Sequence, residues 1–306
     1  MYDLIIVGAG PAGITASIYA ARKRMNFLVI TGNIGGQTLW TTNIENYTGY
    51  QFITGAELVQ KFIEQLEQSR VQLRQGEKVL SIKKESETLK VTTDKAAYEA
   101  RAIVIASGKI PRKLGIPGEE EYRNKGVAYC AACDAPLFSG MDVAVAGGGN
   151  SALDATLQLV NIARRIHLID ASPRFKADPV MIEKIESSDK VAVYHAASIE
   201  RIYGDSFVRG LTVSQAGKSF ELPVQGLFVE IGYMPASDFD SDISRNAYGE
   251  IMVNCNSQTS VPGLFAAGDV TDVSAKQIIV ACGEGAKATI AAFSYLERQA
   301  AKQEAL

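Results

Sequence analysis

The chain has 306 residues, of which 47% are hydrophobic and 21% are charged, as in a soluble globular protein long enough for two domains. A net charge of −3 excludes a basic surface of the kind that binds nucleic acid or an anionic membrane, and we predict neither partner. No apolar run approaches the roughly 20 residues that span a bilayer, and the N-terminus lacks the basic and apolar segments of a signal peptide. We therefore expect a cytoplasmic protein.

The first predicted element is a buried strand at residues 3–7, which leads through a glycine-rich turn into a helix over residues 11–22. The turn has the spacing G-x-G-x-x-G, in which the first glycine permits the tight turn and the second lets the backbone approach a pyrophosphate. The third glycine allows close packing of helix on strand, and the start of the helix offers free N–H groups to phosphate. The predicted dinucleotide contacts in this turn are Gly8, Gly10, Pro11, Ala12 and Gly13.

The same domain continues through a second strand at residues 27–30 and an alternating segment at residues 83–98 that reads as a β-meander. Residues 102–108 form another predicted buried strand, which ends in a glycine turn at Gly108. Prolines and glycines between residues 109 and 118 then indicate a crossing into another domain.

A dithiol motif follows this crossing, with Cys130 and Cys133 directly before Asp134. In a reducing compartment a single Cys-x-x-Cys is more often metal-binding or redox-active than structural. Zinc would need two further ligands, but the chain has only two histidines and no second Cys-x-x-Cys, so we predict no metal site. The other two cysteines, which we expect to be buried and without a chemical role, are Cys255 and Cys282.

A second strand, glycine turn and helix begin at residue 142, with the helix expected over residues 151–163. One fixed offset carries the first glycine motif onto this one and the strand at residues 27–30 onto residues 166–169. Two copies of one βαβ unit in the same register predict two related dinucleotide-binding domains. The predicted contacts of the second turn are Gly147, Gly149, Asn150, Ser151 and Ala152.

The second copy ends its second strand at Asp170, an acid about 20 residues after the first glycine of the turn. Such an acid accepts hydrogen bonds from the ribose diol of NAD, and it repels the 2′-phosphate of NADP. We therefore expect this chain to prefer NADH to NADPH.

Toward the C-terminus the first domain resumes, with a short apolar strand that stops at Gly268 and Asp269 and a helix over about residues 277–298. The predicted fold is α/β, with two doubly wound, three-layer dinucleotide-binding domains, the second inserted into the first. We place the first domain at residues 1–113 and 246–306, and the second, which carries the dithiol, at residues 114–245.

Over essentially its whole length the chain resembles the low-molecular-weight thioredoxin reductases and, more closely, the flavoprotein part of alkyl hydroperoxide reductase. A dithiol inside the nicotinamide domain is specific to this group. Besides the two glycine turns, the resemblance rests on Gly35, Gly36, Gln37, Glu45, Asn46, Cys130, Cys133, Asp134, Gly268, Asp269, Lys276, Gln277 and Ile278.

The resemblance implies that FAD binds the first glycine turn, with Gln37 and Asn46 near the flavin and Asp269 on the ribitol chain. The backbone at Gln277 and Ile278 would then face the pyrimidine edge of the flavin. Further cofactor contacts implied in this way are Gly36, Gly108, Gly268 and Lys276.

The resemblance also implies that Cys133 faces the flavin, that Cys130 attacks the disulfide of a partner and that Asp134 shuttles a proton. The chemistry agrees, because thiolate is the reactive form of cysteine and an adjacent carboxyl group of raised pKa serves as acid or base. The chain departs from the family at Ala135, where the family has glycine, and at Thr31, where many dinucleotide folds have an acid.

Taken together, the motifs predict an electron path from NAD(P)H through FAD and the dithiol to a separate thioredoxin- or glutaredoxin-like protein, in an enzyme that the resemblance implies to be a homodimer. A separate acceptor is expected because the chain starts directly at the first strand, without the thioredoxin-like module of its relatives. NADPH-dependent relatives hold the 2′-phosphate with a His-Arg-Arg run where this chain has Asp170, Ala171 and Ser172, although Arg174 and Lys176 lie nearby. The alternatives are a ferredoxin-linked or oxidase-type flavoprotein on the same fold, or a nucleotide sensor without catalysis.

Overall fold

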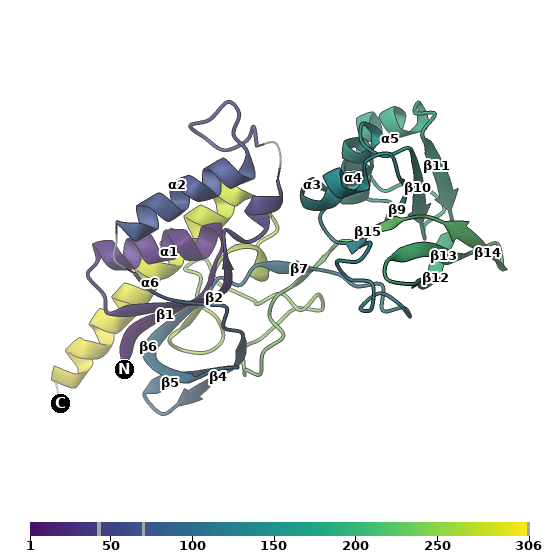
Figure 1. The fold of residues 1–306 in the computed structure, drawn as a ribbon. Coiled ribbons are helices and arrows are strands. Elements are labelled where there is room, and N and C mark those ends of the chain that lie inside the picture. Colours follow the sequence, from purple (N-terminus) through teal and green to yellow (C-terminus); the bar gives the residue numbers. More distant parts are fainter. Residues whose placement is uncertain (42–43, 69–70, 305–306) are drawn as a thin grey trace. The chain divides into compact units, whose positions relative to one another are not determined.

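The computed structural model describes residues 1–41, 44–68 and 71–304 (Figure 1). The described part of the chain forms two compact units. Unit 1 comprises Met1–Ile110 and Met234–Leu306, and unit 2 comprises Pro111–Tyr233. At the two crossings between them, strands β7 (Lys109–Pro111) and β16 (Tyr233–Pro235) pair with each other.

Unit 1 is built on a sheet with the order β3-β2-β1-β6-β5-β4, in which β17 also pairs with β6. The pairs among β1, β2, β3, β6 and β17 are parallel, whereas β4, β5 and the first half of β6 form the expected antiparallel meander. The strands are β1 (Tyr2–Ala9), β2 (Phe27–Ile34), β3 (Gln72–Gln75), β4 (Val79–Glu85), β5 (Thr88–Thr93), β6 (Ala97–Ile105) and β17 (Leu264–Ala266).

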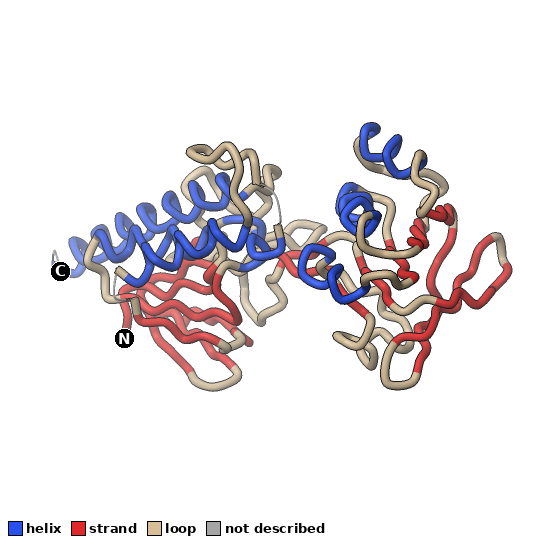
Figure 2. Tube along the Cα trace, turned by 45° about the horizontal axis from the view of Figure 1, so that its top comes forward, coloured by secondary structure: helices blue, strands red, loops and turns tan. Residues whose placement is uncertain are grey.

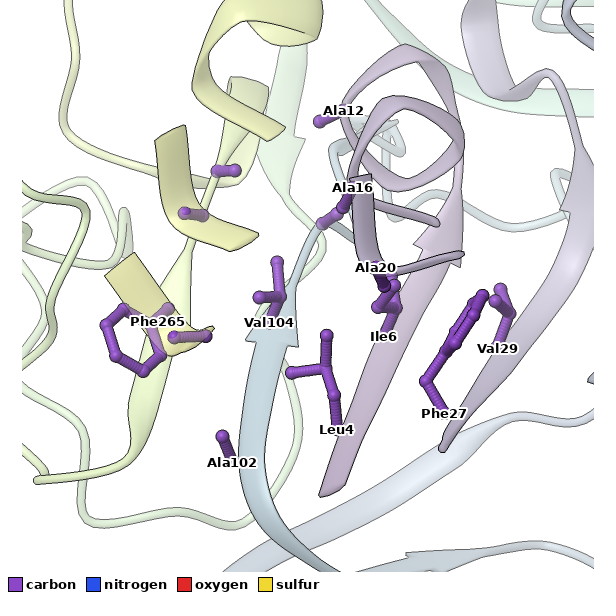
Figure 3. Packing of buried hydrophobic residues seen from close by; sticks show 14 of the residues in the cluster. Leu4, Ile6, Ala12, Ala16, Ala20, Phe27, Val29, Ala102, Val104 and Phe265 are labelled. Atoms are coloured by element: carbon purple, nitrogen blue, oxygen red, sulfur yellow. The ribbon is translucent and has the colours of Figure 1, made fainter. Parts of the chain in front are cut away.

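Both faces of this sheet are buried, because alternate residues of β1 belong to different apolar cores. Leu4 and Ile6 face α1 (Pro11–Arg22) and α6 (Ile278–Glu304), as Figure 3 shows, and α2 (Gly55–Glu67) lies in the same unit (Figure 2). A small residue on α6 allows this helix to come close to α1, since a Cβ on Gly285 would lie 2.0 Å from the carbonyl oxygen of Ala12. A strand buried on both faces has an uninterrupted apolar sequence, which explains why β1 is predictable.

Unit 2 has a parallel sheet in the order β11-β10-β9-β15-β8. One face packs against helices in one apolar cluster, and the other packs against an antiparallel sheet in a second cluster, which gives three layers. The parallel strands are β8 (Val127–Ala128), β9 (Asp142–Ala146), β10 (Arg165–Asp170), β11 (Val191–His195) and β15 (Gly226–Val229). The helices are α3 (Ala131–Asp134), α4 (Asn150–Val160) and α5 (Pro179–Glu186), and the antiparallel strands are β12 (Ala197–Gly204), β13 (Val208–Gln215) and β14 (Lys218–Pro223).

The predicted α/β fold with two doubly wound units is therefore confirmed. Several ends differ from the sequence prediction. The helix expected at residues 151–163 is α4, which ends at Val160, and the strand expected at residues 264–269 ends at Ala266 before a 3-10 turn, η3 (Gly268–Val270). Two other 3-10 turns are η1 (Gly36–Trp40) and η2 (Ala135–Phe138).

The second crossing between the units lies at Tyr233 and Met234, rather than at residues 245 and 246 as the sequence analysis expected. Phe239 and Ile243 pack into the core of unit 1, which draws this segment away from unit 2. Arg245 holds the segment together, because its guanidinium donates to the carbonyl oxygens of Ser237 and Phe239. Buried contacts of this kind leave no trace in composition or periodicity. Among the described residues, no helix combines the length and the apolar character needed to cross a membrane.

Candidate functional site

The first glycine turn of unit 1 has two positions that the fold itself requires. Gly8 has φ +104°, and a Cβ there would lie 2.3 Å from the carbonyl oxygen of Ala106. A Cβ on Gly13 would lie 1.9 Å from the carbonyl oxygen of Gly8, so the start of α1 rests directly on the turn. Gly10 differs, because no described atom lies within 4 Å of its Cβ position. The fold leaves this space open above the start of α1, where a phosphate group fits.

Thr31 occupies the position where many dinucleotide folds place an acid. Its hydroxyl accepts a hydrogen bond from the Ala9 N–H at 3.2 Å and donates to the Asn33 carbonyl oxygen at 2.5 Å. The side chain is 5% exposed. Thr31 therefore holds the backbone just before Gly10 against β2.

Other predicted cofactor residues of unit 1 contact one another or the turn. The Cβ position of Gly36 lies 3.4 Å from Gly10 Cα. Gln37 donates to the carbonyl oxygen of Lys109 at 2.6 Å, directly after Gly108, and Asn46 donates to the side chain of Gln277 at 3.0 Å. Gln277 directly precedes Ile278, the first residue of α6. Residues from widely separated parts of the sequence thus contact one another in unit 1, and Gly36 lies directly beside Gly10.

Gly268 brings the C-terminal arm to the same place. Its φ is +76°, its Cβ position lies 3.0 Å from Ala12 Cβ, and its N–H donates to the buried Glu284 carboxylate at 2.7 Å. Asp269 follows, and burial raises the pKa of its carboxyl group, while Lys276 and Lys109 act in the opposite direction.

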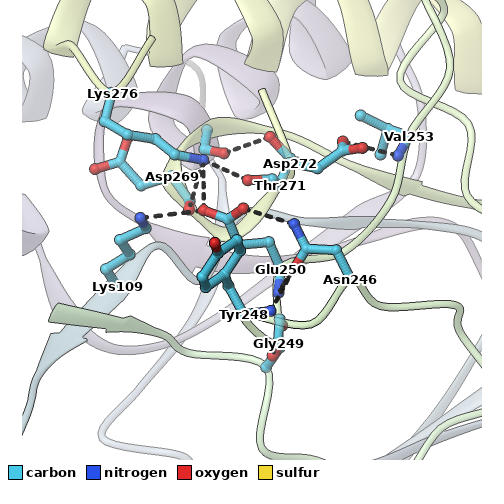
Figure 4. A network of polar contacts seen from close by, with 12 residues as sticks. Lys109, Asn246, Tyr248, Gly249, Glu250, Val253, Asp269, Thr271, Asp272 and Lys276 are labelled. Atoms are coloured by element: carbon cyan, nitrogen blue, oxygen red, sulfur yellow. Dashed lines mark hydrogen bonds and ion pairs between the residues drawn. The ribbon is translucent and has the colours of Figure 1, made fainter. Parts of the chain in front are cut away.

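A network of ion pairs surrounds Asp269 (Figure 4). Glu250 accepts from Lys109 and Lys276, each at 3.2 Å, and from Asn246 at 2.8 Å. Burial opposes the ionisation of Glu250, but these hydrogen bonds outweigh burial and lower its pKa. The Lys276 ammonium also donates to the Asp269 and Thr271 carbonyl oxygens. The network fixes two cations beside Asp269, in a position to hold the anionic or carbonyl groups of a cofactor.

Unit 2 contains a cavity of about 550 Å³ at the second glycine turn. Gly147 has φ +135°, and its Cβ position lies 2.3 Å from the carbonyl oxygen of Glu230. The closest described atom to the Cβ position of Gly149 is 3.9 Å away, so this glycine leaves open space, as Gly10 does. The glycine turn supplies one wall of the cavity through Gly147, Gly148, Gly149, Asn150 and Ser151.

Asp170 lies in this cavity and is 3% exposed. One carboxylate oxygen, Oδ1, accepts a hydrogen bond from the Ser172 N–H at 2.9 Å. The other, Oδ2, lies 3.5 Å from His195 Nδ1, and among the described residues neither of these two atoms has a hydrogen-bond partner. A buried carboxylate oxygen without a donor suits a ribose hydroxyl group.

The sequence analysis did not single out Gly148, which the site requires. A Cβ at this position would lie 2.2 Å from the carboxyl carbon of Asp170. Any side chain on Gly148 would therefore displace the carboxylate. The signal that could have identified Gly148 is the uninterrupted run of three glycines in the sequence.

The dithiol segment lies in unit 2, where Cys130 directly precedes α3. Cys130 is disulfide-bonded, and the Cys133 side chain lies outside the described residues. Burial raises the pKa of the Asp134 carboxyl group, as a proton-shuttling acid requires. Among the described residues, Asp134 makes no capping hydrogen bond to the turn that follows it.

The other cysteines are free. Cys282 is buried as expected, but the expectation for Cys255 was wrong, because it is exposed. Cys255 lies in a tight turn in which the Asn254 side chain accepts from the N–H groups of Asn256 and Gln258. The turn directs this cysteine to solvent.

Glu230 is a second residue that the sequence analysis missed. It follows β15, lines the cavity and is 9% exposed. Burial and the negative charge of Asp154 raise its pKa to about 7, although a hydrogen bond with the Ala131 backbone acts in the opposite direction. The only signal in the sequence was an acid directly after the apolar run of residues 226–229.

A sequence model of the family described as pyridine nucleotide-disulphide oxidoreductase matches residues 2–285. The chain belongs to this family. The family is one of flavoproteins that use FAD and a pyridine nucleotide, and the open positions at Gly10 and Gly149 and the unpartnered Asp170 oxygen fit these two ligands.

Two curated relatives and one solved structure show how far the similarity extends. An alkyl hydroperoxide reductase component of Staphylococcus aureus (strain MSSA476) is 40% identical over 301 residues, which are 97% of this chain and 59% of that protein. A Bacillus subtilis (strain 168) protein named NADH dehydrogenase is 37% identical over 300 residues, with the same two coverages. The chain thus spans about three fifths of the length of these relatives. The crystal structure of Lactococcus lactis thioredoxin reductase superposes with a TM-score of 0.87 at 33% identity, covering 97% of this chain and all of that one.

Proposed function

We propose that the chain is a flavoprotein disulfide reductase that passes electrons from NADH through FAD and the Cys130–Cys133 dithiol to a thioredoxin- or glutaredoxin-like protein. The observation that carries the proposal is the disulfide-bonded Cys130 in the same unit as the nucleotide cavity, beside an acid of raised pKa. The relatives named thioredoxin reductase and alkyl hydroperoxide reductase support it. The built cavity of unit 2 favours a pyridine nucleotide over ferredoxin as the electron donor.

In this proposal unit 1 holds FAD. The N–H groups at the start of α1 bind the pyrophosphate above Gly10, and Asp269 accepts from a ribitol hydroxyl group. FAD, when bound, accepts two electrons from a nicotinamide and passes them to a disulfide. Lys109 and Lys276 hold their positions through Glu250 and supply positive charge beside Asp269.

The dithiol chemistry belongs to unit 2. As a thiolate, Cys130 attacks one sulfur of the partner disulfide, so that the partner's S–S bond breaks and a mixed disulfide forms. Cys133 then attacks Cys130, which regenerates the disulfide of the enzyme and leaves the partner with two reduced sulfurs. Asp134 donates the proton that the departing partner thiolate needs.

The preference for NADH rests on Asp170, whose unpartnered oxygen lies in the cavity where the adenosine ribose would bind. The relative named NADH dehydrogenase supports the same preference. A 2′-phosphate at this position would meet a buried negative charge, and Coulomb repulsion in a partly buried site is strong.

The first experiment tests the cofactors and the dithiol together. We expect acid-denatured protein to release about one FAD per chain, and we expect anaerobic NADH to bleach the flavin in the wild type and in the Cys130→Ser variant. The variant should lose disulfide reduction by at least about a thousandfold. Release of no flavin, or a Cys130→Ser variant that still reduces disulfides, would overturn the proposal.

The nucleotide preference has its own test. We expect kcat/KM for NADH to exceed that for NADPH at least tenfold, and a variant carrying Asp170→His, Ala171→Arg and Ser172→Arg to reverse the order. A matched variant with Arg174→Ala and Lys176→Ala should lower the residual use of NADPH only. A wild type that prefers NADPH would contradict the assignment of Asp170. The predicted homodimer and cytoplasmic location stay predictions, and light scattering of the purified protein measures the first.

A further inference from the structure

Glu230 connects two parts of unit 2 that the proposed chemistry uses separately. Its backbone packs against the second glycine turn. The Glu230 N–H donates to the Ala146 carbonyl oxygen at 2.8 Å, and the Glu230 carbonyl oxygen leaves no room for a side chain on Gly147. Its side chain carboxyl group hydrogen-bonds the backbone of Ala131. Ala131 is the first residue of α3 and directly follows Cys130.

The surroundings of Glu230 leave its charge poorly compensated. Among the described residues, the titratable groups that act on it are Asp154 on α4 and Tyr233 on β16, and α3 contributes a hydrogen bond from the Ala131 backbone. Neither side chain is cationic, and Glu230 is 9% exposed. Burial and Glu230 in turn raise the pKa of Tyr233 to about 12. A carboxyl group in this position changes its charge near neutral pH.

We propose that Glu230 is a positioning residue whose ionisation controls the reactivity of Cys130. The carboxylate places a negative charge next to the backbone that carries Cys130, and this charge disfavours the thiolate that attacks the partner disulfide. The protonated carboxylic acid removes the repulsion while the side chain stays in place under α3. The inference rests on the proposed role of the dithiol and adds a residue that regulates it.

The magnitude follows from Coulomb's law. Two like charges about 8 Å apart, at an effective dielectric constant of about 30 to 60 that lies between protein interior and water, shift the equilibrium of one of them by about half to one pKa unit. Ionised Glu230 should therefore lower the thiolate fraction of reduced Cys130 by about three- to tenfold.

Thiol alkylation of the reduced protein measures this effect without any turnover. The protein is reduced, treated with iodoacetamide between pH 5.5 and 9.5, and the rate at Cys130 is read by peptide mass spectrometry. Cys255, which is exposed, free and located in unit 1, serves as the internal control in every sample. We expect the Cys130 profile of the wild type to flatten as Glu230 ionises near pH 7.

Glu230→Gln removes the charge and keeps an oxygen that accepts from Ala131. We expect this variant to lose the flattened region and to react about three- to tenfold faster at Cys130 at pH 8, with an unchanged rate at Cys255. Glu186→Gln, an exposed carboxylate of α5 in the same unit, is the matched control and should leave the profile unchanged. Glu230→Asp should restore the inflection.

Asp154→Asn keeps the proposal testable if Glu230→Gln does not fold. Without the negative charge of Asp154, Glu230 ionises more readily, so the inflection in the Cys130 profile should move to lower pH. Identical Cys130 profiles in wild type, Glu230→Gln and Asp154→Asn would overturn the proposal, as would a change that Cys255 shares. Disulfide reduction by Cys130→Ser, in contrast, would overturn the proposed function and leave the Glu230 result standing.

Discussion

The two glycine turns of this chain have the same backbone conformation and differ in the side chains that surround them. At the first position Gly8 and Gly147 have positive φ, and in both the Cβ position lies 2.3 Å from the carbonyl oxygen of the residue that follows the adjacent strand. At the second position Gly10 and Gly149 both leave open space. Backbone geometry therefore fixes these positions, because any side chain would collide with the strand or fill the phosphate position.

The differences concern the positions around the turn. Ala9 and Thr31 of unit 1 correspond to Gly148 and Asp170 of unit 2. In unit 1 the small Thr31 hydroxyl group bonds the Ala9 N–H and leaves room for the Ala9 side chain. In unit 2 the larger carboxylate lies where that side chain would be, so glycine is required. The residue at this position of the second strand thus decides which neighbour the turn can hold.

A third difference lies at the residue directly after the adjacent strand. Ala106 and Glu230 make the same backbone hydrogen bond, to the carbonyl oxygens of Val7 and Ala146 respectively. Unit 1 has a small apolar side chain there, and unit 2 has a carboxyl group in contact with the dithiol segment. At this position only unit 2, which contains the dithiol, has a titratable side chain.

The largest expected effect is at the third glycine position. Gly13→Ala would place a Cβ 1.9 Å from the Gly8 carbonyl oxygen, so we expect a loss of about 3 kcal/mol or more in the free energy of unfolding, together with loss of bound FAD. The matched change Ala152→Gly in unit 2 removes a methyl group from a helix and should cost only about 1 kcal/mol. Denaturant unfolding and flavin content measure both. Equal effects of the two substitutions would show that the third position of the turn is not more restricted in unit 1 than in unit 2.

The next effect tests the coupling between Gly148 and Asp170. Gly148→Ala alone should weaken NADH binding by about a hundredfold, because its Cβ would displace the carboxylate. The double variant Gly148→Ala with Asp170→Thr recreates the pair found in unit 1. We expect it to regain the stability of the wild type while remaining weak in NADH binding. Calorimetry measures NADH binding, and thermal unfolding measures stability. Additive effects of the two substitutions on stability would contradict the coupling.

The pH dependence of stability separates Ala106 from Glu230. A carboxyl group with a raised pKa in the folded state stabilises that state most below its unfolded pKa of about 4.5 and loses the contribution as pH rises to about 7. We expect Glu230 to lower the free energy of unfolding by up to about 3 kcal/mol between pH 5 and pH 8. Glu230→Ala, which reproduces the residue of unit 1, should remove most of this slope in urea unfolding. An unchanged slope would show that Glu230 is not the group responsible.

The smallest expected effect is at Thr31. Thr31→Val keeps the shape but removes the hydrogen bond to the Ala9 N–H, so we expect a loss of about 1 kcal/mol in the free energy of unfolding and about a threefold weaker affinity for FAD. Thr88→Val removes a solvent-exposed hydrogen bond to the Glu85 carbonyl oxygen, in the turn between β4 and β5, and is a control that should leave the FAD affinity unchanged and the stability nearly so. An FAD affinity equal to that of wild type would show that FAD binding does not depend on the hydrogen bond to the Ala9 N–H.

The sequence alone was enough to locate those helices and strands whose bounds are set by residues close to them in the chain. The bounds of α1 agree with the prediction because the glycine turn and Pro11 fix where a helix begins. Strands β1 and β9 were recognised because burial on both faces leaves an uninterrupted apolar run. The repeat itself, the dithiol in unit 2 and the position of Asp170 at the end of β10 followed from the same local patterns.

Only the tertiary structure decided the features that join distant segments. Glu230 meets Gly147 because β15 pairs with β9, and its contact with Ala131 joins residues far apart in the sequence. His195 meets Asp170 through the pairing of β11 with β10, and the segment after Met234 belongs to unit 1 because Phe239 and Ile243 are buried there. A single sequence records which residues can bury or ionise, but parallel pairing brings together residues with no fixed spacing along the chain. Their charges and partners are therefore set only when the sheet forms.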